Sequence, residues 1–424
     1  MVEGLEGKRW LAGRVADIAS LKAGRHAVLR ISADGRKYLL PLSKCGCPPG
    51  HGVRFRGEEL CEAEFCREFL EDVASGRVPG IRVVGSIPLP LRFLGVLRED
   101  STHPLALYWA GGQRVVVKGY REETKHNYEP FFYYYLRGKG LTPPFKAYYE
   151  WRGSPLGLIT GYLEGEDGGL KFYRSLLNSL KSGEAEAPEE EACRVARVLA
   201  GFHVAMLGCA EGWCGTAIVD AGDVESWRRR IRFYYGRIHS PILKERVEAA
   251  ARGMEKYLGS LKARIHQDFH LSQLMRVGGE YFILDFEGEP GRPEAWRGEL
   301  EPPLRDFASL LRSISYISFF AVKEAGSLSM EEAAETLFTD SNEMSVVRTW
   351  GRSVARILAE CYLERLEELG GGGAAMSLEN AEELLEIVEP WYVERGLYEA
   401  YYEAMYRKKN VVAAVSTLAA HVPL

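Results

Sequence analysis

Two short stretches decide the fold: IHQDFHLSQ at residues 265–273 and LDFEGEP at residues 284–290. Between them, two apolar runs flank a Gly-Gly pair, a pattern typical of a tight β-hairpin. Because a hairpin returns the chain toward its start, we expect Gln273 and Asp285 to lie close together. Both side chains offer oxygen atoms, the ligands that Mg²⁺ prefers. Asp268 adds a carboxylate just before the hairpin.

These stretches resemble the catalytic core of the aminoglycoside-phosphotransferase-like kinases, and within them the maltokinase branch, whose pattern is close to H-G-D-x-H-L-x-Q and D-F-E-G-E-P. Gln267 stands where that family usually has Gly. PLRDFASLLRS at residues 303–313 resembles the family's P-L-R-D-V-A-x-M-L-R-S stretch, and YEAYYE at 398–403 is similar to its Y-E-x-x-Y-E helix. The resemblance implies an α+β, two-lobed, protein-kinase-like fold with a β-rich N-terminal cap and a mostly helical C-lobe.

Phosphoryl transfer from ATP needs a carboxylate beside the acceptor hydroxyl and oxygen ligands for Mg²⁺. We therefore expect Asp268 to be the catalytic base, with Gln273 and Asp285 as metal ligands. By resemblance, Glu287 contacts the metal or the acceptor, although a solvated or salt-bridged acid is the alternative. The two aspartates could also be ordinary turn or strand-end acids, but their joint spacing around one hairpin argues against this.

His266 and His270 have the spacing of a metal-binding pair. We favour structural roles over that alternative, because oxygen ligands suit Mg²⁺ better. We also place His270 among the acceptor-site residues.

For the nucleotide, no Gly-x4-Gly-Lys-Ser/Thr motif is present, which excludes a P-loop kinase. Lys118 ends an apolar strand and matches the phosphate-contacting lysine of the resembled fold. Glu129, on the next predicted helix, is our candidate for its partner acid, while the maltokinase pattern places that acid nearer Phe131.

Two further segments complete the predicted nucleotide site. Ser101 and Thr102 lie in the turn that should cover the phosphates, where a plain polar turn is the alternative. Thr160 and Tyr162 belong to a stretch that looks like the hinge offering backbone groups to adenine.

A sugar acceptor needs carboxylates for its hydroxyls and aromatic faces for its ring. The predicted helices of the C-terminal half supply both, although a solvated helix face could carry the same acids. The family's last motif normally continues into Asn-Arg-Pro, where this chain has Tyr406-Arg407-Lys408. The candidate acceptor residues here are Asp306, Arg312, Tyr398, Glu399, Tyr402 and Glu403.

The 424 residues predict a cap at 1–92, the remainder of a nucleotide-binding lobe with its hinge at 93–166, and a helical lobe at 167–424. A hairpin around Asp34-Gly35, strands at 105–109, 114–118 and 156–163, and a helix at 129–136 are expected in the first half. An acidic loop is expected at 183–191. Apolar spacing in the second half predicts helices over 191–207, 244–261, 304–322, 344–369 and from 378 onward.

Composition narrows the function classes. A net charge of −5 without a basic field argues against nucleic acid as the main partner. We see neither a signal peptide nor a membrane span, and expect a soluble cytoplasmic protein. Glutamine occurs only at positions 113, 267 and 273, and such depletion of amides suggests a thermophile. Whether the chain is a monomer or a dimer stays open.

Eight cysteines are present. The spacings Cys45-x-Cys47 and Cys209-x4-Cys214 fit the common zinc patterns poorly. Structural disulfides are a second alternative, because intracellular disulfides occur in hyperthermophiles. Plain buried thiols are the interpretation that we favour.

The sequence thus predicts an ATP- and Mg²⁺-dependent kinase acting on a small-molecule sugar, a phosphotransferase with an alcohol acceptor. By resemblance, maltose converted to maltose 1-phosphate is the first expectation, followed by glucosamine, glucose, trehalose or another small acceptor. The alternatives from other classes are a kinase of a protein or an antibiotic, and a non-catalytic nucleotide-binding scaffold.

Overall fold

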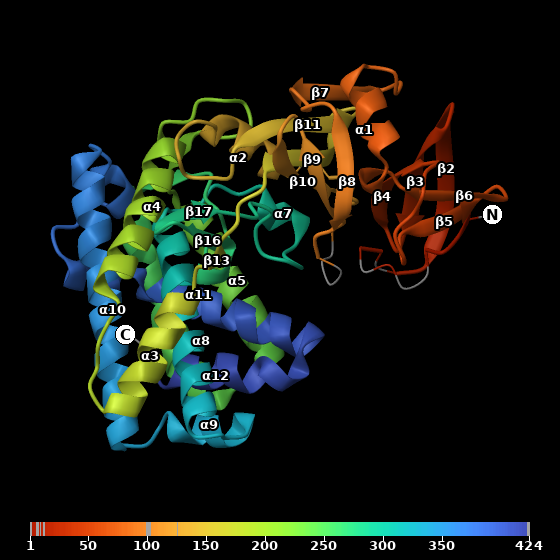
Figure 1. Cartoon of the computed structure of the whole chain (residues 1–424). Coiled ribbons are helices and arrows are strands. Elements are labelled where there is room, and N and C mark those ends of the chain that lie inside the picture. Colours follow the sequence, from red (N-terminus) through yellow and green to blue (C-terminus); the bar gives the residue numbers. More distant parts are fainter. Residues whose placement is uncertain are drawn as a thin grey trace. The chain divides into compact units, whose positions relative to one another are not determined.

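The computed structural model describes residues 2–5, 8, 10–11, 13–98, 103–124 and 126–421. The chain divides into two compact units, Met1–Glu164 and Gly165–Leu424. Unit 1 is β-rich and unit 2 is mostly helical, as predicted (Figure 1). The predicted boundary at residue 92 inside unit 1 stays a prediction. In the described residues, no helix is long and apolar enough to cross a membrane.

The first sheet of unit 1 has six antiparallel strands in the order β1-β5-β6-β4-β3-β2. The predicted hairpin at its centre is present. Asp34 and Gly35 both have positive φ, 43° and 79°, as two-residue hairpin turns require. The strands are β1 (Val2–Glu3), β2 (Val15–Ala23), β3 (His26–Ala33), β4 (Arg36–Ser43), β5 (Gly52–Phe55) and β6 (Glu58–Glu62).

The second sheet of unit 1 also has six antiparallel strands, in the order β7-β11-β12-β10-β9-β8. Helix α1 (Arg67–Ala74) packs against β7 and β8, and α2 (Glu129–Leu136) packs against β11 and β12. Its strands are β7 (Ile81–Gly85), β8 (Leu91–Val96), β9 (Leu105–Ala110), β10 (Gln113–Gly119), β11 (Phe145–Trp151) and β12 (Ser154–Gly161).

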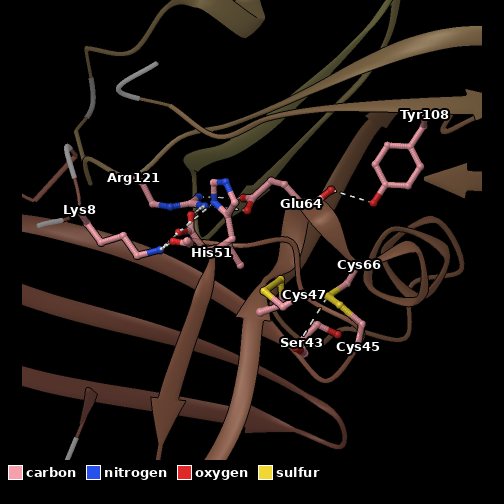
Figure 2. Close-up of a disulfide and its surroundings, with 12 residues drawn as sticks. Lys8, Ser43, Cys45, Cys47, His51, Glu64, Cys66, Tyr108 and Arg121 are labelled. Carbon is pink, nitrogen blue, oxygen red and sulfur yellow. Dashed lines mark hydrogen bonds and ion pairs between the residues drawn. A yellow bond between two sulfur atoms is a disulfide. The ribbon is translucent and has the colours of Figure 1, made fainter. Parts of the chain in front are cut away.

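Two disulfides fasten the region where the first sheet meets α1: Cys45–Cys66 and Cys47–Cys61 (Figure 2). Cys193–Cys361 and Cys209–Cys214 lie in unit 2, so all eight cysteines are paired. The favoured interpretation of free thiols is therefore wrong. The sulfur atoms of Cys45, Cys61 and Cys66 also lie within 4.8 Å of one another, so the zinc alternative stays a prediction. Pairing depends on which cysteines the fold brings together, which spacing alone does not reveal.

Beside these disulfides, a buried arginine joins two segments of unit 1. Arg121 lies 2.7 Å from both Glu62 and Glu64, and all three side chains are buried (Figure 2). Such an ion pair persists without water only because each charge meets an opposite one. It links the segment after β10 to the end of β6 and to the 3-10 turn Ala63–Phe65.

Unit 2 is built around α11 (Ala381–Tyr406), which contacts α5, α6, α8, α10 and α12 (Figure 1). Residues 390–398 of this helix are buried all round. The other main helices are α3 (Leu170–Ser182), α4 (Glu189–Leu207), α5 (Ala221–Ile238), α6 (Lys244–Gly253), α7 (Glu294–Arg297), α8 (Leu304–Ala325), α9 (Met330–Thr336), α10 (Asn342–Glu368) and α12 (Val411–Ala419).

Two predicted bounds in unit 2 differ from the structure. The acidic loop is shorter than predicted, because α4 already begins at Glu189. The helix predicted over 244–261 ends at Gly253, where an added Cβ would lie 2.7 Å from the Pro390 Cγ. Close packing against α11 therefore fixes a glycine there, and the chain turns into β15 (Leu261–Ala263), which pairs with β14 (Thr216–Ile218).

The predicted hairpin is formed by β16 (Leu274–Val277) and β17 (Glu280–Ile283), with a third strand, β13 (Glu166–Asp167), on its outer edge. Gly278 and Gly279 both have positive φ, which the two-residue turn requires. The segments that carry the two diagnostic motifs flank this hairpin.

Candidate active site

The first turn of α8 holds the loop before the hairpin through hydrogen bonds to its backbone. The Asp306 carboxylate accepts hydrogen bonds from the backbone N–H groups of His266 (2.7 Å) and Gln267 (2.9 Å). Gln267 has φ 69°, a left-handed conformation that these bonds help to fix. Asp306 is completely buried. It therefore shapes the loop before the hairpin and does not face an acceptor, which corrects its predicted role.

His266 has a structural role in the same loop. Its ring Nε2 donates to the Leu284 carbonyl (2.9 Å), and its Nδ1 accepts from the backbone N–H of Asp268 (3.3 Å). Both ring nitrogens are thus used within the loop, which leaves neither for a metal. The histidine couples the segment before the hairpin to the segment after it.

Asp268 is buried and ionised. Its Oδ1 lies 2.6 Å from Nη2 of Arg395, and its Oδ2 lies 3.7 Å from Nε2 of His270, whose side chain is 31% exposed. Burial by itself raises the pKa of the Asp268 carboxyl, but the charges of Arg395 and His270 outweigh it and hold that pKa well below its usual range. The carboxylate is therefore charged at neutral pH.

Arg395 was not predicted, yet it organises this site. Each of its three nitrogens meets a different carboxylate: Nη2 meets Asp268, Nη1 lies 2.9 Å from Glu289, and Nε lies 3.1 Å from Glu399. The planar guanidinium suits several carboxylates at once. No spacing rule reveals this contact, because the partners come from separate segments of the chain.

Glu289 connects Arg395 to a larger buried ionic cluster behind the site. All its central members are fully buried, so each charge depends on its neighbours for stabilisation. The ion pairs are Arg305–Glu289 (2.6 Å), Arg305–Glu394 (3.2 Å), Arg230–Glu394 (2.8 Å), Arg230–Glu301 (2.7 Å) and Arg292–Glu301 (2.8 Å).

Arg312 was predicted to bind the acceptor, and the structure corrects this. Its side chain is completely buried between α8, α11 and α12. It pairs with Glu399 (2.8 Å) and donates to the hydroxyls of Tyr392 (3.1 Å) and Thr417 (3.0 Å). Arg312 therefore fixes Glu399, which in turn binds Arg395.

The other predicted acceptor residues follow one face of α11. The Tyr398 hydroxyl donates to the Pro290 carbonyl (2.7 Å), and the ring of Tyr402 lies 6.1 Å from that of Tyr398. Glu403 is buried, and burial raises its pKa above the usual range. Among the described residues, its Oε2 has no hydrogen-bond partner. This face thus combines aromatic rings with a buried carboxyl group whose Oε1 lies 3.9 Å from Nη1 of Arg407.

The structure brings the two predicted metal ligands together. Gln273 ends a short 3-10 turn, and its Nε2 lies 3.5 Å from Oδ2 of Asp285. The Leu284 N–H also donates to the Gln273 carbonyl (2.8 Å), which ties the two ends of the hairpin. Asp285 adopts a left-handed φ of 58°, and Glu287 follows two positions later, half-buried. This oxygen-rich donor set fits Mg²⁺.

In unit 1, Lys118 and Glu129 form the predicted ion pair. The lysine Nζ lies 2.7 Å from Glu129 Oε2, and the same oxygen accepts a hydrogen bond from the Tyr120 hydroxyl (2.7 Å). Glu129 is buried at the first turn of α2, where the helix dipole favours a negative charge. The lysine is thus held at the end of β10 in a fixed orientation.

The remaining nucleotide predictions are partly corrected. Ser101 and Thr102 lie outside the described residues. Thr160 is buried inside β12, between Val116 and Phe145 of the neighbouring strands. The Tyr162 N–H donates to the Arg114 carbonyl (3.0 Å), so it already has a partner within the sheet. Any adenine contact from this stretch would use its other backbone groups.

Comparison with known proteins supports this reading of the fold. Glucosamine kinase in one crystal form superposes with a TM-score of 0.67 over 97% of this chain and 95% of that one, at 17% identity. A second glucosamine kinase structure, in complex with glucosamine, ADP and inorganic phosphate, gives 0.64 over 99% and 96%, at 16% identity. The chain has the glucosamine kinase fold. The predicted two-lobed α+β class is therefore confirmed.

Sequence comparison gives shorter matches. A glucosamine kinase of Mycolicibacterium smegmatis is 28% identical over 127 residues, which cover 30% of this chain and 28% of the relative. One from Streptacidiphilus jiangxiensis is 23% identical over 227 residues, covering 51% and 47%. The chain thus matches at most about half the length of these curated relatives. No protein-family model matches, and the maltokinase resemblance stays a prediction.

Proposed function

We propose that the protein is a kinase that transfers the γ-phosphoryl group of ATP to a hydroxyl of a sugar. The observation that carries this proposal is the grouping around one hairpin of a buried, ionised Asp268 with the oxygen ligands Gln273 and Asp285. The fold shared with glucosamine kinases and the names of the two relatives support it.

Asp268 would orient the acceptor hydroxyl by accepting its hydrogen bond. A carboxylate with a lowered pKa is a weak base, but phosphoryl transfer proceeds through a loose transition state in which the nucleophile's proton leaves late. Orientation therefore matters more than basicity. Arg395 keeps the carboxylate charged and fixes its position.

Asp285 and Gln273 would hold Mg²⁺, with the amide of Gln273 turned so that its oxygen faces the ion. The metal would neutralise charge on the nucleotide phosphates. Lys118, oriented by Glu129, would contact phosphates of the nucleotide, as the strand lysine does in protein-kinase-like enzymes.

We place glucosamine first among the acceptors and maltose second. The names of the relatives favour glucosamine. The motif resemblance of residues 398–403 favours maltose, whose second ring would need the aromatic face of α11.

The test is ADP release with ATP and Mg²⁺ for glucosamine, N-acetylglucosamine, maltose, glucose, trehalose and an aminoglycoside. We expect turnover with glucosamine and a large loss with N-acetylglucosamine, which lacks the charged amine. Turnover with maltose alone would select the second candidate. If no acceptor is phosphorylated while ATP still stabilises the protein, the chain is a nucleotide-binding scaffold and the kinase proposal fails.

A further inference from the structure

A pocket of about 500 Å³ lies in unit 2, and its lining contains no residue of the β16–β17 hairpin. Its walls come from α6, α10 and the first half of α11, none of which carries Asp268, Gln273 or Asp285. The volume falls within the range of small-molecule sites. The floor consists of small or apolar residues: Ala249, Ala250, Gly253, Ala355, Leu385 and Pro390.

The positive charges of the residues around this floor outnumber the negative ones. Arg246 pairs with Glu389 (2.9 Å), and Lys256 pairs with Glu386 (2.7 Å). The positive and negative charges of these two ion pairs cancel. Arg352 on α10 also lines the pocket and is exposed, and it makes no ion pair within the part of the chain that the structure describes. A positive charge is therefore left over.

His421 also lines the pocket. Its Nε2 lies 3.4 Å from Oε2 of Glu389. The protein as a whole has a net charge of −5, which makes a locally positive hollow unusual for this surface. Charge next to an apolar wall also acts more strongly than charge in open water.

We propose that this pocket binds a small organic anion, with an apolar body on the alanine-lined floor and a carboxylate or phosphate head paired with Arg352. The planar guanidinium binds either head through two parallel hydrogen bonds. A free sugar fits poorly, because the floor offers few partners for its hydroxyls. The proposal is independent of the proposed kinase activity, since it concerns different residues.

The experiment is calorimetric titration of the full chain with phenyl phosphate, phenylacetate and the uncharged 2-phenylethanol, all in saturating ADP and Mg²⁺. The nucleotide keeps the phosphate probe out of the nucleotide site. We expect at least one anion to bind, with the neutral alcohol weaker by about tenfold, the loss expected for one charged hydrogen-bonded contact. The anion that binds more tightly shows whether the pocket prefers a phosphate or a carboxylate group.

Two matched variants test the location. Arg352→Gln should weaken the anion about tenfold, whereas Arg356→Gln, one turn further on α10 and paired with Glu360, should leave it unchanged. Ala249→Trp, at the exposed edge of this floor, should block all probes without unfolding the chain, which circular dichroism checks. Absence of anion binding to the unmodified protein, equal loss in both arginine variants, or unchanged binding after Ala249→Trp would each overturn the proposal.

Discussion

The Arg395 guanidinium and the Asp268 carboxylate form a buried ion pair, with Nη2 of the arginine 2.6 Å from Oδ1 of the aspartate. Their side chains are only 6% and 7% exposed. In such surroundings the attraction is much less screened than in water. The site is therefore built around a carboxylate that stays charged and has a fixed direction.

Asp268→Asn should abolish most turnover while leaving the fold intact. The amide has the same shape but is neutral, so it orients the acceptor hydroxyl less firmly and no longer forms the ion pair with Arg395. Losses of about 10²- to 10⁴-fold in kcat are typical for such groups. Steady-state kinetics with glucosamine measures the effect, and ATP binding by calorimetry serves as the control. A variant with near-normal kcat would remove Asp268 from the proposed role.

Arg395→Met should shift the acid limb of the kcat/KM profile to higher pH. The charge of Arg395 lowers the pKa of Asp268, whereas burial raises it. Without the arginine the effect of burial is less opposed, so the carboxylate becomes protonated at a higher pH. Arg395→Lys keeps the charge and should shift the limb less. An unmoved acid limb in a folded, active Arg395→Met variant would show that the arginine does not control this titration.

Much of the catalytic loop could be predicted because its function lies in local motifs. Gln273 and Asp285 were placed together from a hairpin pattern, and Lys118 and Glu129 from a strand followed by a helix. The roles of Asp306 and Arg312 were mispredicted because charged residues on a helix usually face water. Here the first turns of α8 are wholly buried, so the same residues bind backbone and carboxylates instead.

The partners of Arg395 could not be predicted for a related reason. They are brought together from α11, the catalytic loop and the segment after β17, which only the tertiary fold makes neighbours. One signal was present: the charges at 394 and 395 interrupt an otherwise apolar stretch of α11. A charge within a helix that is buried all round needs a buried partner.

Asp285→Asn should raise the Mg²⁺ concentration needed for half-maximal turnover by at least about tenfold, since a charged ligand is replaced by a neutral one. Asparagine tolerates the left-handed φ of 58° as well as aspartate does, so the backbone should not change. The measurement is a Mg²⁺ titration of activity at saturating ATP, with Glu280→Gln on the exposed part of the same hairpin as the control. An identical Mg²⁺ dependence in both variants would contradict the metal site.

Glu129→Gln should weaken ATP binding and leave acceptor binding unchanged. The substitution removes the charge that holds Lys118 and leaves a neutral partner 2.7 Å away, so the lysine loses its fixed orientation. We expect KM for ATP to rise about tenfold, and the KM for the acceptor to stay the same. A rise confined to the acceptor KM would exclude the nucleotide role of this pair.

Removal of Cys193–Cys361 should destabilise the protein more than removal of Cys209–Cys214. The first disulfide links α4 to α10 across a sequence separation of 168, whereas the second spans a separation of 5. A cross-link over a longer loop removes more entropy from the unfolded chain, and about 2–4 kcal/mol is typical. Denaturant unfolding of the two double Cys→Ala variants, followed by tryptophan fluorescence, compares them. Equal losses of unfolding free energy would show that loop closure does not determine the contribution of these bonds.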